Sequence, residues 1–464
     1  MTDAKQHDNA DEPSGEGVHS AQWEKPLSKI LSPLEEFVHR QSTSGLLLML
    51  TALIALVLAN SPLSDMYQQV KAMYAGISLG DWQLKMSVLH WVNDGLMAFF
   101  FFIVGLELKR EISVGELSNL MQATLPIACA IGGMVVPALI YVFFNAGTSS
   151  ISGWGIPMAT DIAFAIGILV LLADRVPKTL ITFLVALAIV DDLGAVLVIA
   201  IFYTNTINLS WLLMAGLILV LLVFLNLGGV RKILPYFLLA IVLWLAVLQS
   251  GVHATLAGVL GAFTVPSRPR YDPGKFSEYV SKLMKKFDDS YARKPNILLN
   301  DELHSVTQSL EESIHAVQPP LQRLEHIWHA PVSLLVIPLF ALLNAGVPIT
   351  LASLQGALSN PVMLGIEAGL LIGKFIGITG TAWLMLKFGI ANLPSGTRFS
   401  QIAGVSFLAS IGFTMAIFIA ELGFEENSEE LLLAKTGILL ASLSAGIIGY
   451  LWLYFSSEKH GMAS

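Results

Sequence analysis

The sequence predicts an all-α membrane protein that crosses the bilayer about twelve times, and its composition is the first observation behind this prediction. The chain has 464 residues, of which 55% are hydrophobic and 13% are charged, whereas soluble domains have about 25% charged residues. The mean hydropathy is +0.69. A single cysteine, Cys129, excludes an internal disulfide framework. The chain is therefore neither an ordinary soluble protein nor a disulfide-stabilised one.

Apolar segments of transmembrane length are the second observation. A helix needs about 20 apolar residues to cross the hydrocarbon core of a bilayer. Runs of roughly this length lie near residues 44–60, 89–106, 121–145, 157–173, 179–203, 209–227, 233–249, 252–266, 330–347, 362–386, 401–420 and 431–455. We therefore expect about twelve transmembrane helices.

Positive charge in the connecting segments is the third observation, because it alternates between the two sides that twelve spans define. One side holds 22 of the 26 Lys and Arg residues, the other holds Lys71, Lys85 and Lys435, and Lys374 lies within a span. Cytoplasmic segments carry the excess of Lys and Arg in membrane proteins. The sequence therefore predicts a multi-pass protein with both termini in the cytoplasm.

The same pattern divides the chain into five parts. These are an acidic cytoplasmic tail (1–40), transmembrane helices 1–8 (41–266), a charged cytoplasmic insert (267–327), transmembrane helices 9–12 (328–456) and a cytoplasmic tail (457–464). The insert has nine basic and nine acidic residues, and its segment 275–290 has helical spacing. We interpret the insert as a solvated helix near the membrane surface; a regulatory domain is the alternative.

The outer segment AGISLGDWQLKM has the pattern of strands instead. Apolar residues alternate on both sides of Gly80 and Asp81, which predicts a β-hairpin near residues 75–87. A small exposed hairpin can pair with its copy in a second subunit. We therefore expect a homodimer through this hairpin, with membrane lipid around the helices and no nucleic acid as a partner.

Two adjacent acids, Asp191 and Asp192, interrupt the apolar stretch ALAIVDDLGAVLVIAIFY. An aspartate at the bilayer centre costs about 2.5–3.5 kcal/mol on insertion scales. With Ala188 and Ala195, the two acids occupy positions i, i+3, i+4 and i+7 of one helix face, and small residues let a neighbouring helix approach closely. We expect both carboxylates to face protein or a water-filled cavity and to serve more than packing.

The stretch IPMATDIAFAIGIL predicts a break in the middle of a span. Pro157 removes a backbone donor and disfavours helix at Ile156, and Thr160-Asp161 is suited to cap a new helix. Broken backbone at this depth is tolerated only where it is buried in protein or lines a cavity. Asp161 is then at the break; a simple cap on a short interfacial span is the alternative.

Two further spans carry polar groups at mid-membrane. In EAGLLIGKFIGITG, glycines recur at Gly369, Gly373 and Gly377, which predicts a close-packed helix face. Lys374 beside them needs a counter-ion, and the three deep aspartates are the candidates. In SFLASIGFTMAIFIAEL, the polar residues around Gly412 indicate a second unwound point.

Carboxylates and freed backbone carbonyls are ligands suited to Na⁺ and Li⁺, which are hard cations like Ca²⁺ and Mg²⁺. Burial favours the protonated carboxylate, whereas a nearby lysine favours the charged one. A site balanced in this way can hold a proton or a metal cation, but not both together. If it is exposed to each side of the membrane in turn, it exchanges one for the other.

Several motifs resemble the NhaA-type bacterial sodium/proton antiporters: VGLELKRE (104–111), MATDIAFAIG, ALAIVDDLGAV, SGVHATLAG (250–258), GLLIGK and ASIGFTMAIFIA. The resemblance extends from about residue 40 to 455. It implies inverted-topology repeats with two discontinuous helices that cross at mid-membrane. It also implies an electrogenic, pH-regulated exchanger of the bacterial inner membrane. Such a protein is not an enzyme, and it expels Na⁺ or Li⁺ in exchange for H⁺ without a cofactor.

The resemblance also implies roles for individual residues. Asp191 and Asp192 are the ion- and proton-binding pair, with Asp192 the more direct ligand. Lys374 pairs with Asp191 and can itself carry a proton. Thr160 and Asp161 complete the cation site at the helix crossing, where Asp161 offsets the positive helix ends.

Other matched positions concern regulation. Glu107, Glu111 and His253 match residues linked to the pH response of the family; an ordinary charged helix end and a structural histidine are the alternatives. The chain also departs from the family pattern at two positions. Phe375 stands where a proline is expected after the lysine, and Glu421 is an additional acid near the outer face.

Three rival classes fit the sequence less well. An intramembrane aspartyl protease needs its aspartates on separate helices, usually with a Gly-x-Gly-Asp stretch, which this sequence lacks. A cation channel would be expected to show repeated polar filter sequences, and the sequence has none. A transporter of organic acids is disfavoured because the deep charges are mostly negative and repel anions.

Overall fold

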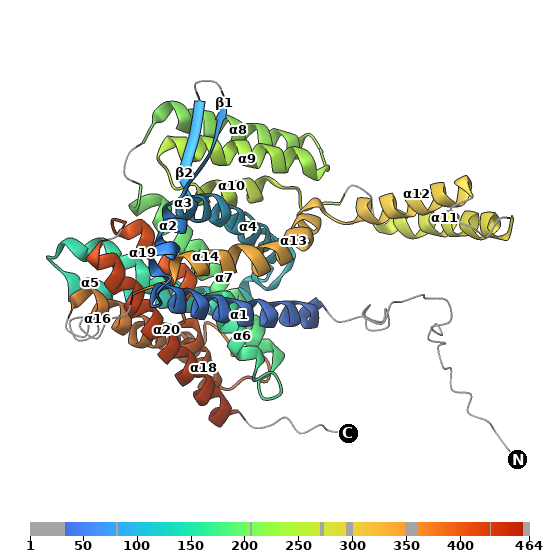
Figure 1. Cartoon of the computed structure of the whole chain (residues 1–464). Helices are drawn as coiled ribbons and strands as arrows, with labels where there is room; N and C mark the ends of the chain where they lie inside the picture. Colours follow the sequence, from blue (N-terminus) through green and yellow to red (C-terminus); the bar gives the residue numbers. More distant parts are fainter. Residues whose placement is uncertain are drawn as a thin grey trace, which may run out of the picture.

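The computed structural model describes residues 33–79, 82–204, 207–269, 273–293, 300–348, 360–426 and 428–457, and these residues are almost entirely helical (Figure 1). The elements up to residue 264 are α1 (Pro33–Ala59), α2 (Ser64–Ala72), β1 (Tyr74–Leu79), β2 (Trp82–Ser87), α3 (Val88–His90), η1 (Trp91–Leu96), α4 (Met97–Val114), η2 (Glu116–Ser118), α5 (Leu120–Asn145), η3 (Ser149–Met158), α6 (Ile162–Val170), α7 (Lys178–Phe202), α8 (Leu209–Leu227), α9 (Ile233–Ser250) and α10 (Thr255–Thr264). The later elements are α11 (Pro273–Arg293), α12 (Asp301–Val317), α13 (Pro320–Pro331), η5 (Val332–Val336), α14 (Ile337–Asn344), α16 (Pro361–Ala368), η6 (Gly369–Gly373), α17 (Lys374–Lys387), α18 (Phe399–Ala409), α19 (Phe413–Gly423) and α20 (Glu429–Ser456).

Most of the long helices can cross a membrane. Among the described residues, nine continuous helical segments are long and apolar enough, and two bent helix pairs raise the number of candidate spans to eleven. The bent pairs are α1 with α2, at 111°, and α18 with α19, at 45°. The chain is therefore a multi-pass helical membrane protein, as the sequence predicts.

The predicted span near residues 252–266 is shorter than expected. It forms α10, which has ten residues and so rises about 15 Å, half of a hydrocarbon core about 30 Å thick. Gly251 ends α9 with a left-handed backbone (φ 81°), and residues 252–254 are not helical. The sequence correctly separates this span from the one before it, but the predicted span includes residues 252–254 and so overestimates the length of the helix.

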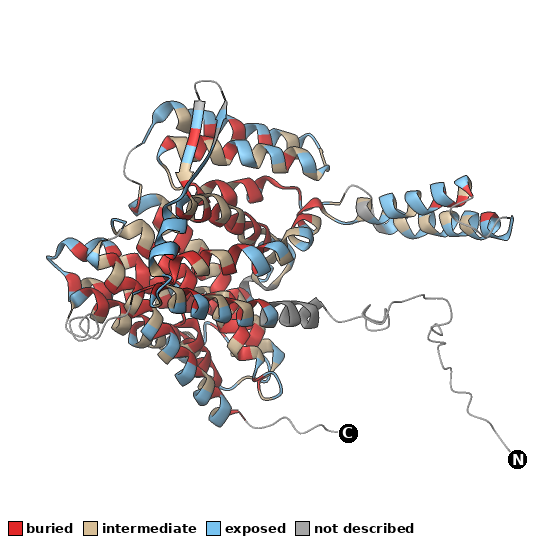
Figure 2. Cartoon of the chain, in the orientation of Figure 1, coloured by how far each residue is buried: buried red, intermediate tan, exposed pale blue. Residues whose placement is uncertain are grey.

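The core runs through the centre of the helical bundle, and most of its helices contribute to it (Figure 2). Glycine allows the closest helix contacts. A Cβ atom at Gly377 of α17 would lie 2.2 Å from the Gly132 carbonyl oxygen of α5, and one at Gly373 would lie 2.8 Å from the Pro137 Cα atom. In a membrane, where lipid tails are as apolar as leucine, this packing is a main source of helix association. The predicted close-packed glycine face is confirmed.

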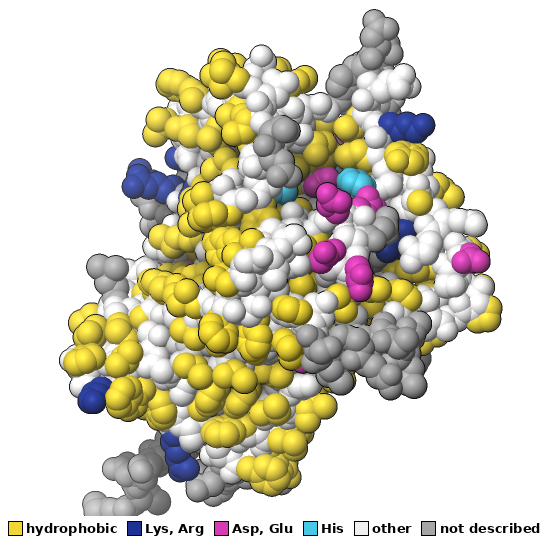
Figure 3. Space-filling view, turned by 90° about the vertical axis from the view of Figure 1, so that its left-hand side faces the viewer, with side chains coloured by type: hydrophobic (Ala, Val, Ile, Leu, Met, Phe, Trp, Pro, Cys, Tyr) yellow, Lys and Arg dark blue, Asp and Glu magenta, His cyan; other side chains and the backbone are white. Residues whose placement is uncertain are grey.

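The outer helix surfaces are largely apolar (Figure 3). On α8, the side chains of Leu213, Leu217 and Phe224 are 66%, 72% and 65% exposed. Such a surface is unfavourable in water and is stable when the acyl chains of a bilayer cover it.

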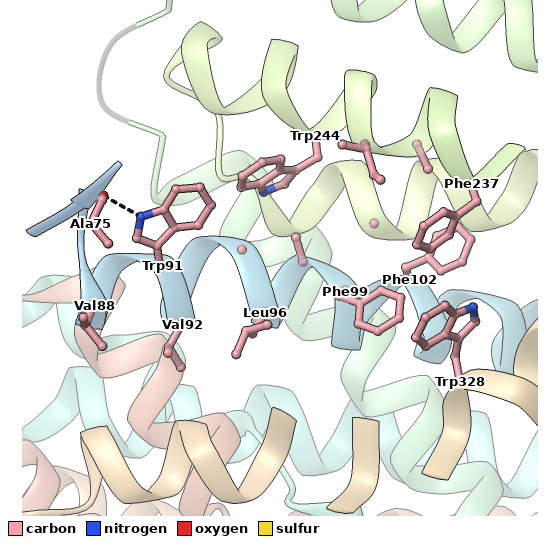
Figure 4. Close-up of a pocket in the computed structure, with 15 residues that line it drawn as sticks. Ala75, Val88, Trp91, Val92, Leu96, Phe99, Phe102, Phe237, Trp244 and Trp328 are labelled. Atoms are coloured by element: carbon pink, nitrogen blue, oxygen red, sulfur yellow. Dashed lines mark hydrogen bonds between the residues drawn. The ribbon is translucent and has the colours of Figure 1, made fainter. Parts of the chain in front are cut away.

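The two strands form the predicted hairpin and are the exception to the all-α prediction among the described residues. β1 and β2 are antiparallel and pair Ile77 with Leu84; the predicted turn at Gly80-Asp81 lies outside the described residues. The Trp91 indole donates a hydrogen bond to the Ala75 carbonyl at 2.9 Å (Figure 4), which ties the hairpin to the start of the following span.

An apolar groove of about 570 Å³ follows that span between α9 and α13. Trp91 and Trp244 lie toward one end of its aromatic lining, and Phe99, Phe237 and Trp328 lie toward the other (Figure 4). The rings of Phe237 and Trp328 are stacked, with their centroids 5.5 Å apart. The lining of the groove is therefore largely aromatic.

The charged insert forms two helices, α11 and α12, that project from the bundle (Figure 1). The predicted helix at 275–290 lies within α11. Leu303 and Val306 of α12 are buried, and the Asn300 side chain donates to the Ser290 carbonyl at 3.2 Å. The insert is therefore a packed helical pair, and not the single helix that the sequence predicts.

Candidate functional site

Two spans lose their helical structure at a point where they touch. In the first, residues 159–161 separate η3 from α6, and in the second, residues 410–412 separate α18 from α19. The Asp161 N–H donates to the Ile411 carbonyl oxygen at 2.6 Å, so the two unwound segments contact each other directly. The breaks predicted after Pro157 and near Gly412 are confirmed.

Asp161 caps two helices at this crossing. Its Oδ1 accepts a hydrogen bond from the Phe164 N–H at 3.0 Å, and so caps α6. Its Oδ2 accepts from the N–H and the hydroxyl of Thr414, in the first turn of α19. Helix N-termini carry partial positive charge, and this one carboxylate offsets two of them. Both of its oxygens are thereby occupied.

Lys374 connects the crossing to α7. Its ammonium group donates to Asp191 Oδ2 at 2.6 Å and to the hydroxyl oxygen of Thr160. The Thr160 hydroxyl in turn donates to the Ala409 carbonyl at 2.8 Å, where α18 ends. Lys374 and Asp191 are buried, with side chains 0% and 1% exposed. The expected pairing of Lys374 with Asp191 is confirmed.

Asp192 lies beside this ion pair but is in a different environment. It is only 3% exposed, and its side chain makes no hydrogen bond or ion pair with any other residue in the described part of the chain. The Oδ1 atom of Asp191 is also buried and has no described hydrogen-bond partner. Ala188 and Ala195, on the same face of α7, are buried as well. The prediction that this face points into the protein is confirmed.

The carboxylate oxygens of the site therefore fall into two groups, those with hydrogen-bond partners and those without a described partner. Buried carboxylate oxygens without a partner are unfavourable unless they bind a proton or a cation. The described residues contain no cluster of three or more His, Cys, Asp or Glu side chains that could hold a metal. Both oxygens of Asp161 are occupied at the crossing, so the carboxylate oxygens without a described partner belong to Asp192 and to Oδ1 of Asp191.

A local change of helix geometry places Lys374. The five residues before it form the π-helix η6, and α17 starts at Lys374 itself. Such π-turns are rare and occur frequently at functional sites. Phe375, in place of the expected proline, stacks on Phe407 of α18 with ring centroids 4.4 Å apart. The span from Pro361 to Lys387 is continuous through this position.

Comparison with known proteins identifies the family of the chain. A family model described as Na⁺/H⁺ antiporter 1 matches residues 35–453. The chain is 53% identical over 443 residues to Na(+)/H(+) antiporter NhaA 1 of Saccharophagus degradans, which covers 95% of this chain and 96% of that protein. The chain belongs to the NhaA family of Na⁺/H⁺ antiporters. It is also 53% identical to NhaA of Sulfurimonas denitrificans over 439 residues, which is 95% of this chain and 99% of that protein.

The predicted regulatory residues of this NhaA family member divide into two groups. Glu107 is buried in α4, one turn before Glu111. Arg110 forms ion pairs with Glu111 at 3.0 Å and with Glu325 of α13 at 3.4 Å. The structure thus places Glu107 and Glu111 in a charged cluster that joins α4 to α13.

His253 lies outside this cluster, between α9 and α10. Its Nε2 atom is 2.6 Å from the carbonyl oxygen of Tyr203, at the end of α7. The Tyr203 hydroxyl donates to the Ser152 carbonyl at 2.7 Å. His253 is therefore positioned to link α10 to α7, a contact that also fits the structural alternative.

Several residues of the NhaA site were not identified from the sequence. Thr414 lay in the predicted unwound region, but its contact with Asp161 joins residues 253 positions apart. Glu325 and Arg110 lay among other charges of the insert and of a helix end. Gly132, the partner of Gly377, has no polar neighbour that marks it. Their roles depend on contacts between distant segments, for which single-sequence patterns carry no signal.

Proposed function

We propose that this chain expels Na⁺ or Li⁺ from the bacterial cytoplasm in exchange for protons, and that Asp192 and Asp191 bind both ions in turn. The chain's membership of the NhaA family supports the exchange. The observation that carries the site assignment is the contrast within α7: Asp192 is buried without a described partner, while Asp191 is held by Lys374.

The exchange follows from competition for the same oxygens. A protonated Asp192 is neutral and cannot attract a cation, whereas the ionised form can bind Na⁺ with the free Oδ1 of Asp191. Because two carboxylates and Lys374 share the site, binding of one cation can release more than one proton. That stoichiometry makes the exchange electrogenic.

Lys374 and Asp161 have supporting roles in this proposal. Lys374 neutralises Asp191 and releases this carboxylate when a cation enters. The released Lys374 ammonium can then lose its proton, so that Lys374 itself carries a proton. Asp161 and Thr160 hold the crossing together and let the unwound carbonyls approach the ion. We therefore assign Thr160 and Asp161 to the cation site as residues that position its backbone, and not as direct ligands of Na⁺.

Regulation by pH fits the cluster on α4 and α13. We propose that protonation of Glu107, one turn from Glu111, changes the ion pairs of Arg110 with Glu111 and Glu325 and so moves α13 against α4. We assign His253 a minor part in this response, because its contact with Tyr203 also explains its position.

The remaining proposals concern the placement of the chain in the membrane. The excess of Lys and Arg on one side places both termini and the insert in the cytoplasm of the inner membrane. The hairpin β1–β2 then lies on the outer side. We propose that it forms a homodimer contact, because its backbone edges can pair with a second copy.

Growth of a bacterial strain that lacks its own Na⁺ exporters tests the proposed function. The wild-type chain is expected to restore growth at high Na⁺ concentration, and Asp192→Asn is expected not to restore it at equal membrane abundance. Asp161→Asn provides a comparison, because it keeps a capping oxygen and removes a buried charge at the crossing rather than the proposed ligand. Restored growth with Asp192→Asn would contradict the site assignment.

A further inference from the structure

A second buried ion pair lies outside the proposed ion site. Glu421, in the last turn of α19, pairs with Lys435 of α20, and their side chains are only 8% and 9% exposed. Neither the sequence motifs nor the proposed exchange explains this pair. Removing two charges from water is expensive, and apolar side chains of similar volume often hold two helices as well or better.

The position of Glu421 adds to the free-energy cost of burying its charge. The last turn of a helix carries partial negative charge, which disfavours a carboxylate. Nearby, the Gly423 carbonyl at the end of α19 accepts a hydrogen bond from the Ser152 hydroxyl at 2.9 Å. Lys435 therefore compensates a carboxylate at an unfavourable place. A pair of this kind is better explained by a requirement for position than by stability.

The opposite end of α19 leads directly to the ion site. The Phe413 N–H donates to the Ser442 hydroxyl of α20 at 3.1 Å, and the adjacent Thr414 donates to Asp161. The helix α19 has eleven residues and is therefore about 16 Å long. α20 thus contacts α19 near both ends, at Ser442 beside the crossing and at Lys435, seven residues earlier on α20.

We infer that the Glu421–Lys435 pair is a positioning pair for ion exchange: it sets where α19 lies on α20, and thereby the contact of Thr414 with Asp161 at the crossing. This inference rests on the proposed function. Neither side chain touches the transported ion. The pair acts through α19, because a shift at one end of a short rigid helix moves its other end.

The decisive variant replaces both charges by apolar side chains of similar length, Glu421→Met with Lys435→Met. The single variant Lys435→Met is less informative, because Lys71 also interacts electrostatically with Glu421. Two further proteins complete the set. Glu421→Gln keeps the size and removes the charge, and the swap Glu421→Lys with Lys435→Glu restores an ion pair.

The chain provides a matched control in α11. Glu278 and Lys282 form an ion pair at 2.6 Å, but both side chains are 72% exposed. Replacing both by Met removes the same charges from a helix that does not contact the ion site. Each protein is reconstituted in liposomes, and the Na⁺ concentration for half-maximal exchange, the maximal rate and the melting temperature are measured.

The double Met variant is expected to keep the wild-type melting temperature and to need about tenfold more Na⁺ for half-maximal exchange, since small misplacements of binding groups have effects of this size or larger. Glu421→Gln is expected to show a smaller rise, the swap to return to within about twofold of wild type, and the α11 control to be unchanged. A wild-type Na⁺ dependence in either Glu421→Gln or the double Met variant would overturn the inference. Absence of exchange in the wild-type protein would instead refute the proposed function.

Discussion

At the residue scale, two adjacent aspartates of α7 differ because only one of them meets Lys374. The Lys374 ammonium is 2.6 Å from Asp191 Oδ2 and also contacts Thr160. Asp192 has no such contact among the described residues. A buried charge that is paired is held in place, whereas an unpaired one is available for an ion. Asp191 is therefore the paired acid, and Asp192 is the acid that we propose binds the ion more directly.

The ion pair of Lys374 makes a prediction about stability. Lys374→Ala is expected to lower the free energy of unfolding by about 3–5 kcal/mol, because it leaves Asp191 buried without a partner. Thermal unfolding in detergent measures the change. Lys387→Ala, at the exposed end of the same helix, is the control and should shift stability by about 1 kcal/mol or less. Equal melting curves for the two variants would argue against a stabilising Lys374–Asp191 pair.

Competition between Na⁺ and protons makes a second prediction at this scale. Raising the pH by one unit is expected to lower the Na⁺ concentration for half-maximal binding by up to about tenfold for each proton that the cation displaces, because ionised carboxylates bind the cation and protons compete with it. Isothermal titration calorimetry at several pH values measures the Na⁺ affinity. An affinity that does not change with pH would contradict a shared site.

At the element scale, the site depends on how closely α5 and α17 approach. The chain offers two glycines on α17 for a matched comparison. A Cβ at Gly377 would lie 2.2 Å from the Gly132 carbonyl oxygen, whereas a Cβ at Gly380 would meet nothing within 4 Å. Because Gly377 follows Lys374 by three residues, a displacement of α17 at this point also displaces the ammonium group.

Gly377→Ala is therefore expected to lower the melting temperature by several degrees and to reduce exchange. The destabilisation is about 1–3 kcal/mol, the range for an overpacked core. Gly380→Ala is expected to leave both properties unchanged or to raise stability slightly, since alanine is the better helix former. If the two variants behave alike, close approach at Gly377 is not required.

The elements show where sequence patterns succeed and where they fail. Pro157 and the polar residues near Gly412 predicted both helix breaks, because a proline or a run of small polar residues changes local backbone preference. The short length of α10 and the pairing of α11 with α12 were not predicted. Both depend on context: residues 252–254 lie within the predicted span but do not form helix, and α12 became recognisable only through its packing on α11.

At the scale of the whole molecule, the apolar surface and the hairpin define how the protein meets its surroundings. The hairpin is attached to the bundle through Trp91 and Ala75 (Figure 4), and the aromatic groove begins beneath it. Its removal should therefore leave the ion site intact while it removes the proposed contact with a second copy.

Deletion of residues 76–85, which keeps Ala75, is expected to convert a homodimer to a monomer and to leave exchange in liposomes within about twofold of wild type. Native mass spectrometry in detergent reports the oligomeric state. The full-length chain is the control at the same protein concentration. A dimer that persists after the deletion would show that another surface holds it together.

The assembly of the site is the part that sequence patterns could least predict. Single charges inside apolar spans marked Asp161, Asp191, Asp192 and Lys374 as functional, because each is too unfavourable there to serve no purpose. Their mutual arrangement came only from the structure and the family resemblance. Lys374 meets partners 183 and 214 positions away in sequence, and no local periodicity encodes such a distance.

Coupled ion movement in proteoliposomes tests the central claim most directly. Wild type and Asp192→Asn are reconstituted with an acidic interior, and a fluorescent pH dye follows the internal proton concentration while Na⁺, Li⁺ or K⁺ is added outside. Dequenching upon addition of Na⁺ or Li⁺ that is absent in Asp192→Asn is the predicted result. The same response in wild type and variant would contradict the assignment of Asp192 as the ion carrier. No response of the wild type to any cation at alkaline pH would contradict exchange itself.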